Sequence, residues 1–129
     1  MKKSVAIFML LLLLIFVVGC GKGYSSDKYN EICDYVSQNK EDIVINSDTE
    51  YYNYEIATEG FVNITYGYYY TEKDEIISCA QDKMSLPTEY TEIGDGGYYF
   101  GEVSDTGDWS FIKKITESWY YFEVHDYLY

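Results

Sequence analysis

Residues 51–71 read YYNYEIATEGFVNITYGYYYT and carry the strongest fold signal in the chain. Tyrosine and β-branched residues, which favour strands, fill both halves of this stretch. Thr58-Glu59-Gly60 separates the halves, and a short glycine-containing connection between two such runs is typical of a β-hairpin. We therefore predict two paired strands over residues 51–57 and 61–71.

The segments around this hairpin predict one helix and several further strands. Residues 26–40 place apolar side chains at helical spacing, with Ser26 or Asp27 available as the N-cap. After a long irregular stretch over 81–97 the chain returns to strand-like runs. The predicted further strands are 76–80, 98–103, 109–115 and 119–124. The sequence thus predicts an α+β fold, with one N-terminal helix packed on an antiparallel meander sheet of about five strands.

The first twenty residues have the pattern of an export signal. Lys2 and Lys3 precede an uninterrupted apolar run over 5–18, which as a helix would span roughly 21 Å, less than the hydrocarbon core of a bilayer. The run ends in Val17-Val18-Gly19-Cys20, which resembles the lipobox of bacterial lipoproteins. The resemblance implies cleavage before Cys20 and a diacylglyceryl group on its sulfur. The alternative is an ordinary cleaved signal followed by an incidental cysteine.

The resemblance covers only the leader and Cys20. Together with the length of the remaining chain it predicts three parts: a signal peptide over 1–19, a lipidated cysteine with a flexible tether over 20–26, and a single acidic domain over 27–129. The protein is then expected on the extracytoplasmic face of the cell membrane, held by its lipid. All nine basic residues are lysine, which favours an AT-rich, Gram-positive source.

The chain is strongly acidic, with 22 acidic residues, nine lysines and a net charge of −13. Two lysines precede Cys20 and every acidic residue follows it, so the part from Cys20 onward has a net charge of 7 − 22 = −15. Such a charge disfavours nucleic acid and favours cationic partners. The expected partners are the membrane, through the anchor, and an envelope protein, a cationic peptide or a glycan.

Cys33 and Cys79 remain after the anchor cysteine. An exported domain lies in a compartment where disulfides form, and a bridge between these two would close a loop that restricts the unfolded chain. The alternative is a pair of small buried thiols, since free cysteine is commonly buried.

Alternation along the strands divides the side chains between a core face and an outer face. The core face is predicted to contain Tyr52, Tyr54, Ile56, Val62, Ile64, Tyr66, Tyr68, Tyr70, Tyr120, Phe122 and Val124. The outer face then exposes Tyr51, Tyr69, Trp119 and Tyr121, with Glu123 and His125 beside the last two. Exposed aromatic side chains next to acids favour a binding surface. The alternative is that these rings form cross-strand pairs that stabilise the sheet.

No catalytic motif stands out in the sequence. It has no recognisable nucleophile–histidine context, no metal-ligand cluster and no phosphate-binding loop, so we predict no catalytic residue, metal or cofactor. We therefore expect a non-enzymatic binding, inhibitory or accessory module. The alternative is a cell-envelope hydrolase that uses paired carboxylates, for example Glu55 and Glu123.

Overall fold

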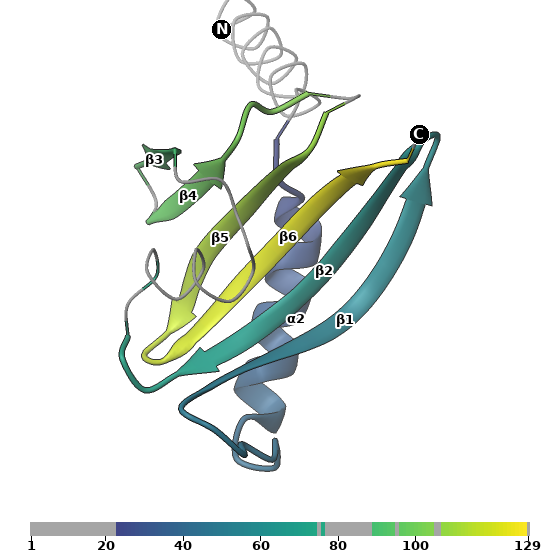
Figure 1. The fold of residues 1–129 in the computed structure, drawn as a ribbon. Coiled ribbons are helices and arrows are strands. Elements are labelled where there is room, and N and C mark those ends of the chain that lie inside the picture. Colours follow the sequence, from purple (N-terminus) through teal and green to yellow (C-terminus); the bar gives the residue numbers. More distant parts are fainter. Residues whose placement is uncertain (1–22, 75, 77–88, 95, 105–106, 129) are drawn as a thin grey trace, which may run out of the picture.

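The structure is a computed structural model that describes residues 23–74, 76, 89–94, 96–104 and 107–128 (Figure 1). Within these residues a helix, α2, packs across one face of a six-stranded antiparallel sheet. The fold is therefore α+β, as the sequence predicted, with six strands in place of about five. The elements are α2 (Ser26–Asn39), β1 (Thr49–Glu59), β2 (Val62–Thr71), β3 (Tyr90–Ile93), β4 (Gly97–Phe100), β5 (Trp109–Thr116) and β6 (Trp119–Tyr127).

The strand order across the sheet is β1-β2-β6-β5-β4-β3. Strands β3 to β6 form a meander, in which each strand pairs with the next along the chain. Its last three strands correspond to predicted strands, whereas β3 was not predicted. The β1–β2 hairpin is not continuous with this meander, because β2 pairs with β6 and β3 lies at the far edge of the sheet.

Helix α2 begins and ends close to where the sequence predicts. The predicted N-cap, Ser26 or Asp27, is wrong by one or two residues, because the Ser25 side chain accepts the hydrogen bond from the backbone N–H of Lys28 that caps the first turn. Ile32 and Val36 are fully buried against the sheet, which is the apolar stripe expected from their spacing.

Two predicted features near the middle of the chain differ in the structure. Strand β3 lies inside the stretch predicted to be irregular. The prediction missed it because the strand is short and only Ile93 of its four residues is partly buried, so the sequence shows no clear alternation of polar and apolar residues. Of the predicted strand 76–80 the structure describes only Ile76, which is helical.

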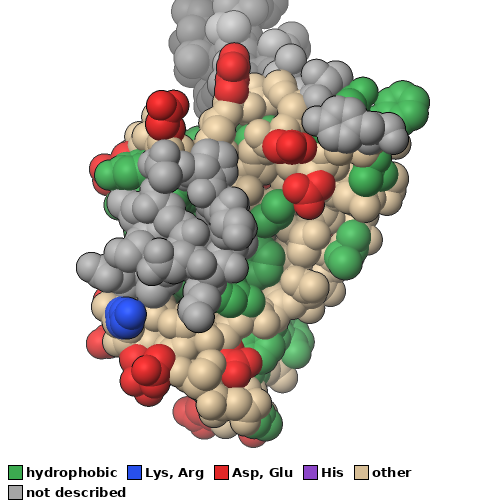
Figure 2. Space-filling view, viewed as in Figure 1, with side chains coloured by type: hydrophobic (Ala, Val, Ile, Leu, Met, Phe, Trp, Pro, Cys, Tyr) green, Lys and Arg blue, Asp and Glu red, His purple; other side chains and the backbone are tan. Residues whose placement is uncertain are grey.

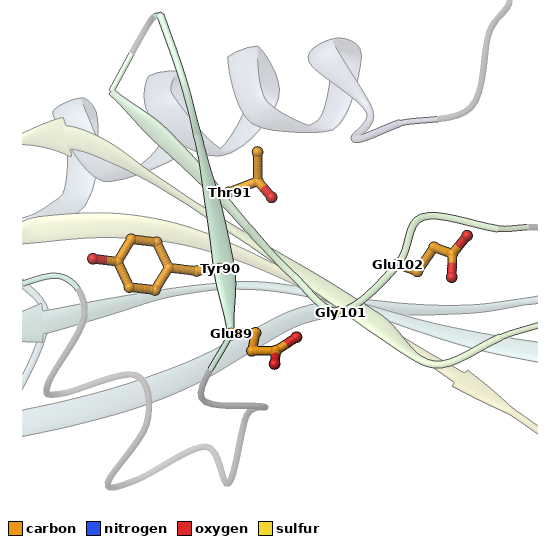
Figure 3. A pocket seen from close by; sticks show the side chains of 5 residues that line it. All are labelled: Glu89, Tyr90, Thr91, Gly101 and Glu102. Carbon is orange, nitrogen blue, oxygen red and sulfur yellow. The ribbon is translucent and has the colours of Figure 1, made fainter.

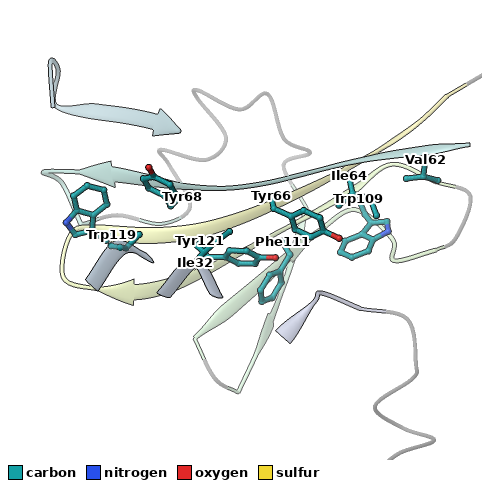
Figure 4. Close-up of a cluster of buried hydrophobic side chains, with 10 residues drawn as sticks. Ile32, Val62, Ile64, Tyr66, Tyr68, Trp109, Phe111, Trp119 and Tyr121 are labelled. Carbon is teal, nitrogen blue, oxygen red and sulfur yellow. The ribbon is translucent and has the colours of Figure 1, made fainter. Parts of the chain in front are cut away.

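Both faces of the sheet carry an apolar cluster. The cluster under α2, which we call the helix-face cluster, is shown in Figure 4. Its buried members are Ile32, Val36, Val62, Ile64, Tyr66, Tyr68, Trp109, Phe111, Trp119 and Tyr121. The opposite-face cluster is smaller, and its buried members are Tyr69, Phe100, Ile112, Tyr120 and Phe122.

This arrangement overturns the predicted exposed aromatic face. Tyr69 and Tyr121 are 0% exposed and Trp119 is 6% exposed, while Tyr51 is half-buried beside the opposite-face cluster. Trp119 and Tyr121 lie under the helix because Tyr121 pairs with Tyr68, and paired residues share a face. Alternation within one strand sorts its side chains into two sets, but it does not say how the sets of distant strands combine.

The rings instead form cross-strand contacts. Tyr69 stacks on Tyr120 with the ring centroids 5.0 Å apart, and Tyr52 stacks on Tyr68 at 5.1 Å. These contacts agree with the alternative interpretation, in which the tyrosines stabilise the sheet.

A bulge in β1 accounts for a second error in the predicted core. The register with β2 shifts between Asn53 and Glu55, which reverses the alternation for the rest of the strand. Ile56 is therefore 61% exposed, Ala57 packs in the helix-face cluster in its place, and Glu55 forms an ion pair with Lys28 of the helix.

Asp74 fixes the β5–β6 turn at the end of the sheet opposite the start of α2. Its carboxylate accepts hydrogen bonds from the Tyr120 hydroxyl (2.5 Å), the backbone N–H of Ser118 (3.2 Å) and Lys114 Nζ (3.0 Å). These donors, led by the Tyr120 hydroxyl, lower the pKa of Asp74 to about 2. The Asp74 side chain is nevertheless 39% exposed.

Candidate functional site

An open pocket of about 690 Å³ lies at the β3 edge of the sheet (Figure 3). Strand β3 contributes one wall, and the segment that follows β4 contributes the other. The register between these strands sets Tyr90 opposite Phe100, so the chain that leaves β4 passes beside the start of β3. The lining residues are Glu89, Tyr90, Thr91, Gly101 and Glu102.

Gly101 gives this pocket its shape. Its φ is +82°, a conformation that side chains disfavour, and a Cβ there would lie 3.1 Å from the carbonyl oxygen of Asp108. The chain can therefore turn sharply after β4 and place Glu102 on the far wall from Glu89, as Figure 3 shows. Both glutamates are exposed, so the pocket carries negative charge and is suited to a cationic group.

A second polar cluster is buried under the first turn of α2. Glu123 is 1% exposed, and its Oε1 accepts hydrogen bonds from the backbone N–H of Ser25 (2.9 Å) and the Tyr121 hydroxyl (2.5 Å). Its Oε2 lies 2.5 Å from His125 Nε2. The His125 ring is stacked on Trp109 with 3.7 Å between centroids. We call Glu123, Tyr121, His125 and Ser25 the Glu123 cluster.

Strand alternation and the helix end together create this cluster. Tyr121, Glu123 and His125 follow one another at every second position of β6 and so point to the same face. The N-terminus of α2 lies above them, where its exposed N–H groups favour a carboxylate. The prediction that these side chains point outward is therefore wrong. Alternating polar residues in a strand rich in aromatics, with the chain's single histidine among them, are a signal for a buried network.

The cluster keeps the neighbouring tyrosines neutral. Burial and then the charge of Glu123 raise the pKa of Tyr121 far above its ordinary value, and the same two causes raise the pKa of Tyr66 to about 12. A neutral Tyr121 keeps its hydroxyl proton and can therefore donate a hydrogen bond to Glu123.

The Glu123 cluster is suited to holding the helix on the sheet. Both carboxylate oxygens already have partners within the protein. Glu55, the other carboxylate named for a hydrolase, lies in the same row of the sheet, with Tyr66 between it and Glu123. It is 2.7 Å from Lys28 Nζ. Neither carboxylate lines the pocket, and the hydrolase alternative remains a prediction.

The remaining predicted site residues fall partly outside the described residues. Cys33 is half-buried on α2 and has no disulfide partner among the described residues, and burial raises the pKa of its thiol. Cys79 and Cys20 lie outside the described part of the chain, so the disulfide and the lipid attachment remain predictions. Among the described residues no group of three or more potential ligands is placed to hold a metal, and no helix is long and apolar enough to cross a membrane.

No protein-family model, curated protein or solved structure matches this chain. The leader and the acidic pocket are therefore the features of this chain that bear on its function.

Proposed function

We propose that this chain is a lipid-anchored extracytoplasmic protein whose folded domain is a binding module for a cationic partner. The observation that carries the proposal is the leader ending in Val17-Val18-Gly19-Cys20, followed within a few residues by a folded domain. A basic start, an apolar run and a lipobox-like end occur together at the position where a lipoprotein signal is cleaved.

The pocket supports a cationic partner at the end of the domain nearest this anchor. Phe100, the last residue of β4, pairs with Ser110, and Ser110 pairs with Val124 next to Glu123. The pocket thus opens at the end of the sheet where the chain enters the fold. Asp and Glu side chains also outnumber Lys on the face of the molecule in Figure 2, so the field around the pocket is negative.

Lipid labelling of a cysteine variant tests the anchor. We expect Cys20→Ala to remain an uncleaved or unlipidated precursor, because the sulfur that receives the diacylglyceryl group is gone. The readouts are incorporation of a labelled fatty acid and the size of the product in the producing bacterium. Cys33→Ala is the matched control and should be processed and labelled normally. Normal processing and labelling of Cys20→Ala would contradict the proposal.

Peptide binding tests the partner class. The purified domain should bind an oligolysine peptide, and Glu102→Gln should weaken that binding, because one of the two pocket carboxylates is lost. Glu92→Gln is the control, since Glu92 is exposed on β3 but does not line the pocket. Titration calorimetry at two salt concentrations measures both effects. Equal weakening by the two variants would show that charge alone, and not the pocket, attracts the peptide.

A further inference from the structure

The fold holds the chain firmly within four residues of Cys20. The backbone N–H of Tyr24 donates to the Tyr99 hydroxyl (3.0 Å), and the Tyr24 ring stacks on Phe111 with 4.0 Å between centroids. The next residue, Ser25, is bound to the buried Glu123. Even when fully extended, the chain from Cys20 to Tyr24 reaches only about 14 Å.

The strands of the sheet extend past this point by a similar length. Tyr24 and Ser25 lie over the row in which Glu123 pairs with Phe111 and Tyr66. From that row β6 continues for four residues to Tyr127, which at strand spacing is roughly 14 Å. Figure 1 shows the β1–β2 turn and the C-terminal end of β6 together, beyond the start of α2. If this end of the sheet faces the membrane, the strands reach as far as the segment from Cys20 to Tyr24. A domain attached through Cys20 then touches the membrane surface in this orientation.

The end of the sheet that this geometry brings to the membrane exposes apolar side chains. Phe61 follows the turn residue Gly60 (φ +62°) and is 70% exposed, and Leu128 is 41% exposed. The backbone N–H of Leu128 donates to the Phe61 carbonyl (2.5 Å), and the Phe61 and Tyr127 rings lie 6.4 Å apart. The turn and the end of β6 are thus fixed to each other. We call Gly60, Phe61 and Leu128 the sheet tip.

We propose that the sheet tip rests in the interface of the membrane that holds Cys20, with the Phe61 ring inserted among the lipids. The proposal rests on the proposed lipid anchor and adds a second, weak membrane contact to it. An apolar ring that leaves water gains free energy, and the anchor supplies the high local concentration that a single ring needs. Glu59 and Asp126, exposed beside the tip, oppose contact with anionic lipid, so zwitterionic lipid is the matching surface.

Tryptophan fluorescence in reconstituted vesicles tests this contact. Phe61→Trp and Val44→Trp are compared in the full-length lipidated protein in phosphatidylcholine vesicles, with and without brominated acyl chains. Val44 is the matched control because it is also 70% exposed but follows the other end of α2. The native Trp109 and Trp119 are buried and give the same background in both variants.

The expected result is a blue-shifted emission from position 61 that is lost with brominated lipid, and an emission from position 44 that is unchanged. Equal emission and quenching at the two positions, with both variants floating with the vesicles, would overturn the sheet-tip contact and leave the anchor intact. A blue shift at position 61 without bromine quenching would assign the tip to a protein partner or a second copy and overturn the proposal. If neither variant floats with vesicles, the anchor fails and the proposal falls with it.

Discussion

Glu123 and Asp74 are carboxylates with the same three kinds of partner but with opposite exposure. Each accepts a hydrogen bond from a tyrosine hydroxyl and from a backbone N–H, and each lies beside a basic side chain. The two hydroxyls come from the neighbouring residues Tyr121 and Tyr120, which point to opposite faces of β6. Glu123 is buried at the start of α2, whereas Asp74 is partly exposed at the β5–β6 turn.

From this difference we expect burial, more than the number of hydrogen bonds, to determine how much such a cluster contributes to stability. If the Asp74 carboxylate is lost, water can take its place as the acceptor for the Tyr120, Ser118 and Lys114 donors. It cannot easily reach the donors of Glu123, which would remain under the helix without an acceptor, at a cost of about 1–3 kcal/mol for each group. The Glu123 cluster therefore holds the start of α2 on the sheet, whereas the Asp74 contacts stabilise only the β5–β6 turn.

The largest expected effect is on Glu123. We predict that Glu123→Ala lowers the free energy of unfolding by about 3–5 kcal/mol, because it leaves buried donors unpaired. Asp74→Ala, which removes the same kinds of contact at an exposed site, should have a clearly smaller effect. Urea denaturation followed by circular dichroism measures both.

If Glu123→Ala does not fold, Glu123→Gln keeps an acceptor for the Ser25 N–H and should still lose more stability than Asp74→Asn. Equal losses for the two matched pairs would contradict the assigned importance of burial.

A smaller loss of folding stability is expected at high pH. The pKa of Tyr66 is raised to about 12, so the neutral phenol is favoured in the folded state. Its contribution to stability is present below the ordinary tyrosine pKa, near 10, and is lost as the pH rises through 12. Tyrosinate absorbance and circular dichroism should therefore change together in this range.

Replacing Tyr66 by phenylalanine should move that transition to higher pH, whereas Tyr90→Phe, at an exposed ring, should not. Titration of every tyrosine near pH 10 with the fold unchanged would refute the claim that the helix-face tyrosines are protected.

The local elements were predictable because their signals are local. The helix follows from the spacing of Ile32 and Val36, although its cap is Ser25 and not Ser26 or Asp27. The hairpin follows from the two aromatic runs around Gly60. The sheet order and the burial of both faces depend on the pairing of β2 with β6, which brings together residues 49 to 65 positions apart in the sequence. No pattern within a single strand contains that information.

The same limit applies to the candidate sites. The acidic composition of the chain favours a cationic partner. The placement of Glu89 and Glu102 in one pocket, however, depends on strand β3, which is too short and exposed to predict. The partners of Glu123 come from the start of α2 and from β6, nearly a hundred residues apart. The error at Ile56 has a local cause, the β1 bulge, that leaves no clear mark in the sequence.

The lipid anchor can be tested by the intact mass of the wild-type protein extracted from membranes of the producing bacterium. We expect a mature chain that begins at Cys20 and carries the added mass of a diacylglyceryl group on that residue. A mature chain that begins at another residue, or one that begins at Cys20 without lipid, would contradict it.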